Sequence, residues 1–270
     1  MYKFYSKVWK MKFAKKSLGQ NFLIDKNIIR KIINLTDFKN KNVIEIGPGK
    51  GALTEEILKN DPRSLSIIEK DNNLANILKK KYDKNNLVEV YKADILKINL
   101  EILIKKNSII IGNLPYNISS QILVRILRLK KWPPKFKSLI FMFQKELAEK
   151  IIANYLSREY GRLSILTKYR LNIKKSFLVS RNCFFPKPKI TSQIIHFQPK
   201  LLKKFRIKKI QSLEKITNII FSNKRKMINK NIKKIIDKKK LKLLPEINLK
   251  LRPADIEPET YYKITQLYEE

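Results

Sequence analysis

The sequence predicts an α/β fold with a parallel, doubly wound sheet and a small C-terminal all-helical domain. The first observation behind this prediction is an alternation, between residues 26 and 144, of short apolar runs with segments of helical apolar spacing. The second is that residues 200–270 contain no glycine and keep only the helical spacing. Parallel strands need long crossover connections, and this alternation supplies a helix for most of them.

The predicted elements follow one another in a regular order. Each strand is a short run of branched apolar residues, and each helix repeats apolar residues at intervals of three and four. In chain order they are helix NIIRKIINL, strand NVIEIG, helix ALTEEILKN, strand SLSIIE, helix NNLANILKKK, strand NLVEVYKAD, strand SIIIGN, helix ISSQILVRIL and strand SLIFMFQ. Two helical stretches, KELAEKIIANYL and GRLSILTKYR, come next, and then the strand-like pair SFLVS and SQIIHFQ, which we expect to be antiparallel.

The composition changes near residue 200, which predicts a domain boundary there. Beyond it the chain is rich in lysine, and helical spacing is present in IQSLEKITNIIF, KMINKNIKKII and ETYYKITQLY. The predicted parts are a basic N-terminal arm over residues 1–16, an α/β domain over residues 17–199 and a helical domain over residues 200–270. The arm contains aromatic residues and no acidic ones, and Met11 within it is an alternative start.

The charge of the chain favours a polyanionic partner. Lysine and arginine together number 60 against 23 acidic residues, so the formal net charge is +37. Each phosphate contact releases counterions, and a charge of this size therefore favours nucleic acid, with the N-terminal arm touching RNA. The alternative explanation is a lysine-rich proteome that coats every surface, and for any single lysine the two explanations have equal weight.

The sequence disfavours disulfides, metal sites, histidine-based catalytic triads and membrane spans. Cys183 and His196 are the single cysteine and the single histidine, which excludes an internal disulfide, a cysteine-cluster metal site and a histidine-based triad. No apolar run approaches 18 residues, the length typical of a membrane span. We therefore expect a cytoplasmic protein with no metal site and no membrane partner.

The glycines mark expected ligand loops. Gly47, Gly49 and Gly51 lie together in VIEIGPGKGALT, between a predicted strand and a predicted helix. This loop is neither the dinucleotide pattern GxGxxG nor a phosphate-binding loop that ends in GK[ST]. A nucleoside without pyrophosphate fits it better, because the motif fixes no basic residue at the start of the helix. A tight turn without a ligand is the alternative.

Two acidic residues follow the next two strands. Glu69, in SIIEKD, ends the second predicted strand about twenty residues after the glycine loop. A Rossmann-like fold places there a carboxylate that accepts hydrogen bonds from both ribose hydroxyls. Asp94, in YKADIL, would reach an adenine amino group. Either acid alone could be a helix cap. In so basic a chain, two acids at the ends of successive strands favour a binding role.

The segment IIIGNLPYNISS places a polar tetrapeptide at the carboxyl end of a strand, the edge at which open α/β sheets bind ligands. The exocyclic amine of adenine is a poor nucleophile, because its lone pair is delocalised into the ring. Two acceptors would hold the amine in a more tetrahedral geometry: the side-chain oxygen of Asn113 and the carbonyl of Leu114, kept extended by Pro115. Tyr116 offers a ring for stacking. Catalysis would then be mainly orientation, without a strong base, and a plain strand-ending turn is the alternative.

A second aromatic residue is predicted to close the other face of the base. NCFFPKPKIT places Phe184 and Phe185 before two prolines. A flipped-out base is commonly held between aromatic or apolar side chains. Packing in the core is the commoner fate of phenylalanine and is the alternative for this pair.

On these motifs the chain resembles the ribosomal RNA adenine N6-dimethyltransferases, specifically the bacterial small-subunit type. The resemblance rests on KKSLGQNFLID, VIEIGPGKGALTEEIL, IIEKD, KADIL, IGNLPYNISSQIL, FMFQKELAEKI, YGRLSIL, CFFPKPKITSQII, FSNKRKMINKNI and LRPADIEPETYYKI. It implies a class I, Rossmann-like fold that uses S-adenosylmethionine. It also implies dimethylation of N6 of two adjacent adenosines in the 3′-terminal hairpin loop of small-subunit (16S) rRNA, with a role in late subunit assembly.

The resemblance also implies roles for individual residues. The implied cofactor-binding residues are Asn21, Leu23, Gly47, Gly49, Glu69, Asp94 and Asn113. The implied catalytic residues are Asn113, Leu114, Pro115, Tyr116 and Phe184. Residues 17–199 would bind the cofactor, and residues 200–270 would help a monomer dock on the rRNA of the immature 30S subunit. Lys70 departs from the pattern, because an apolar residue often covers the cofactor's adenine at this position; its aliphatic stem could substitute.

Two other functions remain open at this point. One is the macrolide-resistance type of adenine N6-methyltransferase, which acts on large-subunit rRNA; YGRLSIL and LRPADIEPETYY favour the small-subunit type instead. The other is a ribosome-assembly factor that binds RNA without catalysis. The intact NLPY and GPG motifs argue against this second alternative.

Overall fold

The computed structural model describes residues 20–201, 204–243 and 247–270. The predicted basic arm over residues 1–16, with Met11, lies outside the described residues. No helix in the described ranges is long and apolar enough to cross a membrane.

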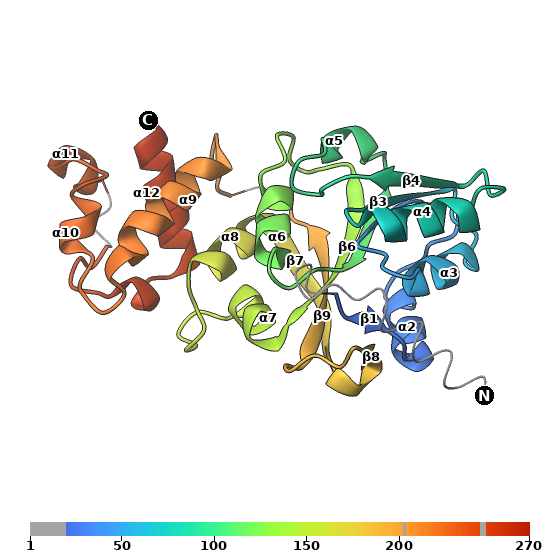
Figure 1. Cartoon of the computed structure of the whole chain (residues 1–270). Coiled ribbons are helices and arrows are strands. Elements are labelled where there is room, and N and C mark those ends of the chain that lie inside the picture. Colours follow the sequence, from blue (N-terminus) through green and yellow to red (C-terminus); the bar gives the residue numbers. More distant parts are fainter. Residues whose placement is uncertain (1–19, 202–203, 244–246) are drawn as a thin grey trace. The chain divides into compact units, whose positions relative to one another are not determined.

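The chain packs into two compact units (Figure 1). The first contains the described residues up to 129, together with residues 134–148 and 173–199. The second contains residues 130–133, 149–172 and 200–270. It therefore includes a segment before residue 200 that the sequence pattern assigned to the α/β domain.

A seven-stranded sheet has the order β4-β3-β2-β5-β6-β9-β7. Its strands are β2 (Asn42–Ile46), β3 (Ser64–Glu69), β4 (Val88–Lys92), β5 (Ser108–Asn113), β6 (Phe136–Gln144), β7 (Leu171–Val179) and β9 (Ser192–Pro199). The strands from β4 to β6 pair in parallel, and β9 is antiparallel to β6. The predicted parallel sheet is confirmed, and the carboxyl ends of β2, β3, β4 and β5 share one edge of it.

Helices connect most of these strands. Those that begin in the first unit are α2 (Lys26–Ile33), α3 (Ala52–Leu58), α4 (Asn72–Lys81), α5 (Leu100–Leu103), α6 (Ser119–Leu127) and α7 (Lys145–Ile152). Those of the second unit are α8 (Arg162–Arg170), α9 (Ile210–Ile220), α10 (Asn229–Ile232), α11 (Lys238–Leu241) and α12 (Pro258–Glu269). The pattern KMINKNIKKII predicted a longer helix than α10.

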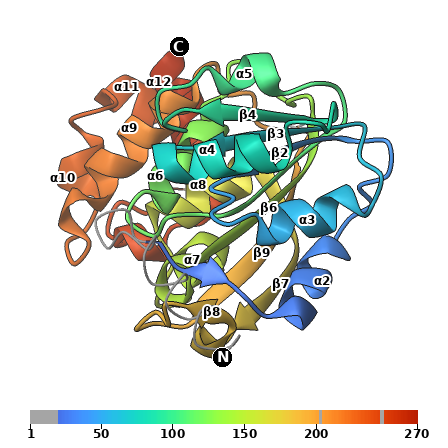
Figure 2. The same ribbon diagram turned by 45° about the vertical axis from the view of Figure 1, so that its right-hand side comes forward.

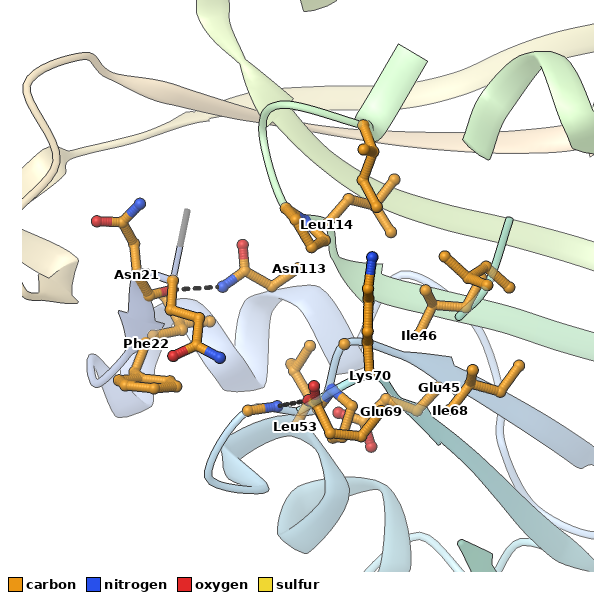
Figure 3. A pocket seen from close by; sticks show the side chains of 18 of the residues that line it. Asn21, Phe22, Glu45, Ile46, Leu53, Ile68, Glu69, Lys70, Asn113 and Leu114 are labelled. Atoms are coloured by element: carbon orange, nitrogen blue, oxygen red, sulfur yellow. Dashed lines mark hydrogen bonds between the residues drawn. The ribbon is translucent and has the colours of Figure 1, made fainter. Parts of the chain in front are cut away.

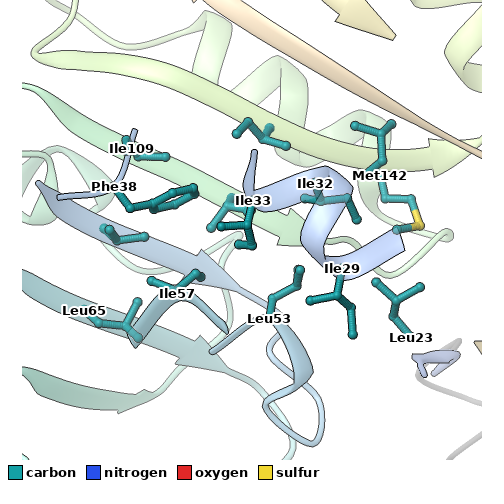
Figure 4. Packing of buried hydrophobic residues seen from close by; sticks show 14 of the residues in the cluster. Leu23, Ile29, Ile32, Ile33, Phe38, Leu53, Ile57, Leu65, Ile109 and Met142 are labelled. Carbon is teal, nitrogen blue, oxygen red and sulfur yellow. The ribbon is translucent and has the colours of Figure 1, made fainter. Parts of the chain in front are cut away.

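The core of the first unit fixes the start of α3, directly after the glycine loop. Ile29, Ile32 and Ile33 lie on one face of α2, at the spacing of three to four residues that a helix needs to align them. They belong to the same buried cluster as Leu53 and Ile57 of α3, and all five are at most 6% exposed (Figure 4). Burying each such side chain contributes about 1.5–3 kcal/mol.

A second, two-stranded sheet joins segments that are distant in the sequence. β1 (Phe22–Leu23) pairs antiparallel with β8 (Phe184–Phe185), and the two lie side by side in both views (Figures 1 and 2). The backbone N–H of Ile24 also donates to the carbonyl of Cys183 at 2.8 Å. These bonds fix the segment before α2, which contains Asn21.

Buried tyrosines support the second unit. Tyr160, Tyr169, Tyr261 and Tyr262 are each at most 5% exposed. Each hydroxyl donates to a backbone carbonyl at 2.7–3.1 Å. In the same order, the acceptors are the carbonyls of Ile256, Phe205, Pro253 and Ile165. Pairing each hydroxyl removes the cost of burying an unsatisfied polar group and leaves the gain from burying the ring.

Position 112 of β5 requires glycine because a side chain would clash with β2, and not because of its backbone conformation. A Cβ added there would lie 2.5 Å from the carbonyl oxygen of Ile46 on β2, which is fixed backbone. Gly112→Ala is therefore expected to lower the free energy of unfolding by about 1–3 kcal/mol, measured by chemical denaturation. Gly161→Ala is the matched control, because its Cβ would meet nothing closer than 3.8 Å. Equal losses for the two variants would contradict the steric argument.

Candidate active site

A pocket lies at the carboxyl ends of β2, β3, β4 and β5 (Figure 3). All of the predicted cofactor-binding residues line it: Asn21, Leu23, Gly47, Gly49, Glu69, Asp94 and Asn113. Leu114, Pro115 and Tyr116 line it as well. The pocket therefore brings the glycine loop, the two strand-end acids and the NLPY segment together, as the order of the sheet requires.

The glycine loop approaches β1 closely enough to exclude side chains. Gly47, Gly49 and Gly51 have φ values of 68°, 59° and 84°, in the left-handed region that L-residues with a Cβ rarely adopt. A Cβ on Gly49 would also lie 2.8 Å from the ring of Phe22. At Gly47 and Gly49 the loop thus presents bare backbone to the pocket.

Glu69 ends β3 with its carboxylate held by backbone donors. Its Oε2 accepts from the N–H of Gly49 at 3.3 Å (Figure 3). Its Oε1 accepts from the N–H of Asp71 at 2.8 Å. Burial raises the pKa of Glu69, and these two bonds oppose that rise. Since each carboxylate oxygen has two lone pairs, capacity remains for hydroxyl donors from a ligand.

Glu45 of β2 is a pocket residue that the sequence analysis missed. It is fully buried, and its Oε2 accepts a 2.6 Å hydrogen bond from the hydroxyl of Thr54 on α3. Its Oε1 has no hydrogen-bond partner within the described part of the chain. Burial raises the pKa of Glu45 to about 7. A signal was available, because a glutamate in the apolar strand NVIEI must be buried, and buried carboxylates need a partner.

The amide of Asn113 is oriented by a contact with the segment before α2. Its Nδ2 donates to the backbone carbonyl of Asn21 at 2.9 Å (Figure 3). This bond uses the donor end of the amide and leaves Oδ1 as an acceptor. The carbonyl acceptor predicted for the clamp is thus available at the end of β5.

Leu114 and Tyr116 are fixed in different ways. The side chain of Leu114 is 1% exposed, so it anchors the turn while its backbone continues along the pocket. The hydroxyl of Tyr116 lies 2.6 Å from that of Ser192 on β9, and burial raises the pKa of the tyrosine. The ring of Tyr116 is therefore fixed at both ends, at its own backbone and at Ser192.

Asp94 is paired in this structure. Its Oδ1 accepts from the N–H of Leu96 at 2.9 Å, and its Oδ2 lies 2.9 Å from the ammonium of Lys70. The bond from Leu96, followed by the contact with Lys70, lowers the pKa of Asp94, so the carboxylate stays ionised. Lys70 also lines the pocket.

Phe184 is not brought to the pocket. Its side chain is 2% exposed and belongs to the core cluster, opposite Leu23 in the β1–β8 pairing. Successive side chains of a strand point to opposite faces, so Phe184 faces the core and Phe185 does not. Phe185 is half-buried and also lies outside the pocket lining. The stacking role of Phe184 stays a prediction that this arrangement does not support.

Comparison with known proteins places the chain in a family. A family model described as "Ribosomal RNA adenine dimethylase" matches residues 11–270. The chain is 44% identical to ribosomal RNA small subunit methyltransferase A of Pelagibacter ubique, over 95% of this chain and 97% of that one. It is 37% identical to the protein of the same name from Malacoplasma penetrans, over 97% of this chain and 95% of that one.

Solved structures agree with the fold. A dimethyladenosine transferase from Plasmodium falciparum is 26% identical and superposes with a TM-score of 0.75 over 90% of this chain and 95% of that one. The 23S rRNA methyltransferase ErmE, at 22% identity, superposes with a TM-score of 0.69 over 93% of this chain and all of that one. The predicted Rossmann-like methyltransferase fold is confirmed, and the chain belongs to the ribosomal RNA adenine dimethylase family.

Proposed function

We propose that this chain dimethylates N6 of two adjacent adenosines in the 3′-terminal hairpin loop of small-subunit rRNA, using S-adenosylmethionine. The observation that carries the proposal is the orientation of Asn113, whose Nδ2 bond to Asn21 leaves Oδ1 as an acceptor at the pocket that the glycine loop and Glu69 also line. The names of the relatives support the small-subunit substrate over the large-subunit alternative. The immature 30S subunit as target, a monomeric enzyme and a cytoplasmic location belong to the same proposal.

The residues of the pocket fit S-adenosylmethionine. The oxygens of Glu69 would accept from the ribose hydroxyls, and the bare backbone at Gly47 and Gly49 allows a close approach. Glu45, whose Oε1 has no hydrogen-bond partner among the described residues, suits the ammonium group of the methionine part. Asp94 would accept from the adenine amino group. When bound, the cofactor supplies an activated methyl group.

The NLPY segment would orient the target amine. Asn113 Oδ1 and the carbonyl of Leu114 accept its two N–H groups, which moves the nitrogen lone pair out of conjugation with the ring. Tyr116 stacks on the base, and Pro115 keeps the turn rigid. The methylated nitrogen is acidic and loses its proton to water, so orientation in a water-poor site replaces a general base.

Radiolabelled methyl transfer to immature small subunits tests the proposal. Label is expected in N6,N6-dimethyladenosine of small-subunit rRNA, and mass spectrometry of both rRNAs should find large-subunit rRNA unmodified. Primer-extension stops at the paired adenosines, in cells with and without the gene, provide a second readout. A chain that binds the cofactor but labels no adenosine would reject the proposal.

A further inference from the structure

Lys70 and Asp94 join the ends of two neighbouring strands across the rim of the pocket. Lys70 directly follows β3, Asp94 follows β4, and these strands pair in parallel. The ammonium of Lys70 lies 2.9 Å from Asp94 Oδ2, and both residues line the pocket. Figure 3 shows Lys70 with an extended side chain among the pocket residues.

This ion pair occupies the carboxylate of Asp94, the hydrogen-bond acceptor expected to recognise adenine. Asp94 Oδ1 already accepts from the N–H of Leu96, and Oδ2 is paired with Lys70. An amino group that donates to Oδ2 must displace the ammonium, or else bond to a carboxylate whose charge is already compensated. Charged acceptors form stronger hydrogen bonds than neutral ones. The pair therefore weakens the attraction of Asp94 for a ligand while it remains closed.

Lys70 can leave this position at small cost. Its side chain is 57% exposed, whereas that of Asp94 is 16% exposed. A released ammonium would be hydrated at once, and the flexible stem needs no backbone movement. Partly exposed ion pairs are weak, so ligand binding can open this one.

We propose that the Lys70–Asp94 pair is a gate over the adenine end of the cofactor pocket, closed without cofactor and opened when the adenine amino group replaces Lys70 on Asp94. Lys70 thereby lowers the affinity for the cofactor and makes it sensitive to salt. This inference rests on the proposed function, because it takes S-adenosylmethionine as the ligand.

Calorimetric titration of the full chain with S-adenosylhomocysteine tests the gate without a methylation assay. This ligand has no net charge at neutral pH, so salt acts mainly through the protein's own ion pairs. Lys70→Met, which keeps an unbranched stem, is expected to bind about two- to fivefold more tightly at about 0.05 M salt. The affinity of the unmodified chain should rise toward that of the variant at about 0.5 M salt, as the pair is screened.

Two further variants control the experiment. Lys70→Arg keeps a cation beside Asp94 and should bind like the unmodified chain. Lys97→Met removes an exposed charge that also acts on Asp94 but lies outside the pocket lining, and it should change little. Equal or weaker binding by Lys70→Met would overturn the gate and leave the proposed function intact. Failure of the unmodified chain to bind the ligand would overturn both.

Discussion

Replacement of Asn113 by alanine is expected to reduce the rate of adenosine methylation about 10²- to 10³-fold, the usual effect of removing one preorganised polar group from a reacting centre. The variant loses Oδ1, one of the two proposed acceptors for the target amine. It also loses the 2.9 Å bond to the Asn21 carbonyl, which fixes the amide. Binding to small subunits is expected to survive, because the substitution leaves the formal net charge of +37 unchanged.

Three measurements on Asn113→Ala separate the explanations of a low rate. Single-turnover methylation reports on the clamp, titration with S-adenosylhomocysteine on cofactor binding, and sedimentation with subunits on RNA binding. Asn73→Ala is the matched control, because this asparagine is exposed on α4 and lies outside the pocket. Methylation within tenfold of the unmodified chain would show that another group holds the amine. If the unmodified chain bound small subunits but methylated no adenosine, the assembly-factor alternative would be favoured.

Features that depend on neighbouring residues could be predicted from the sequence. The glycine loop lies between a strand and a helix that are adjacent in the chain, and its positive φ values require glycine locally. Glu69 and Asp94 end consecutive strands, and a doubly wound sheet places such ends at one edge. In the structure both acids line the pocket together with this loop, and their binding role stays a prediction.

Features that depend on distant segments could not be predicted in the same way. Asn113 and Asn21 are 92 residues apart, and no local pattern indicates which end of the amide faces the pocket. β1 and β8 have two residues each, too few for a periodicity, yet their pairing turns Phe184 into the core. The ion pair of Lys70 with Asp94 likewise depends on the pairing of two strands.

Glu45 is expected to make the stability of the cofactor-free protein fall as pH rises. Its pKa is about 7 in the folded chain because of burial, against an ordinary value of 4.5. Between these values the folded state binds more protons than the unfolded state, so the free energy of unfolding decreases with pH. The contribution is complete below about pH 4.5 and is lost above about pH 7. The difference in pKa corresponds to about 3 kcal/mol.

Glu45→Gln isolates this contribution, because the variant cannot ionise and its amide oxygen can still accept from Thr54. Chemical denaturation from about pH 5 to about pH 8 is expected to show the unmodified chain losing about 2–3 kcal/mol more than the variant. The comparison uses the slope of the free energy of unfolding against pH. The absolute stability of the variant is not compared, because burial of the new amide NH2 group changes it as well. Glu146→Gln, at an exposed position of α7, should keep the slope of the unmodified chain. Parallel curves of the free energy of unfolding against pH, for the unmodified chain and Glu45→Gln, would mean that Glu45 does not hold a proton near neutral pH. Its Oε1 would then be hydrated or paired in solution.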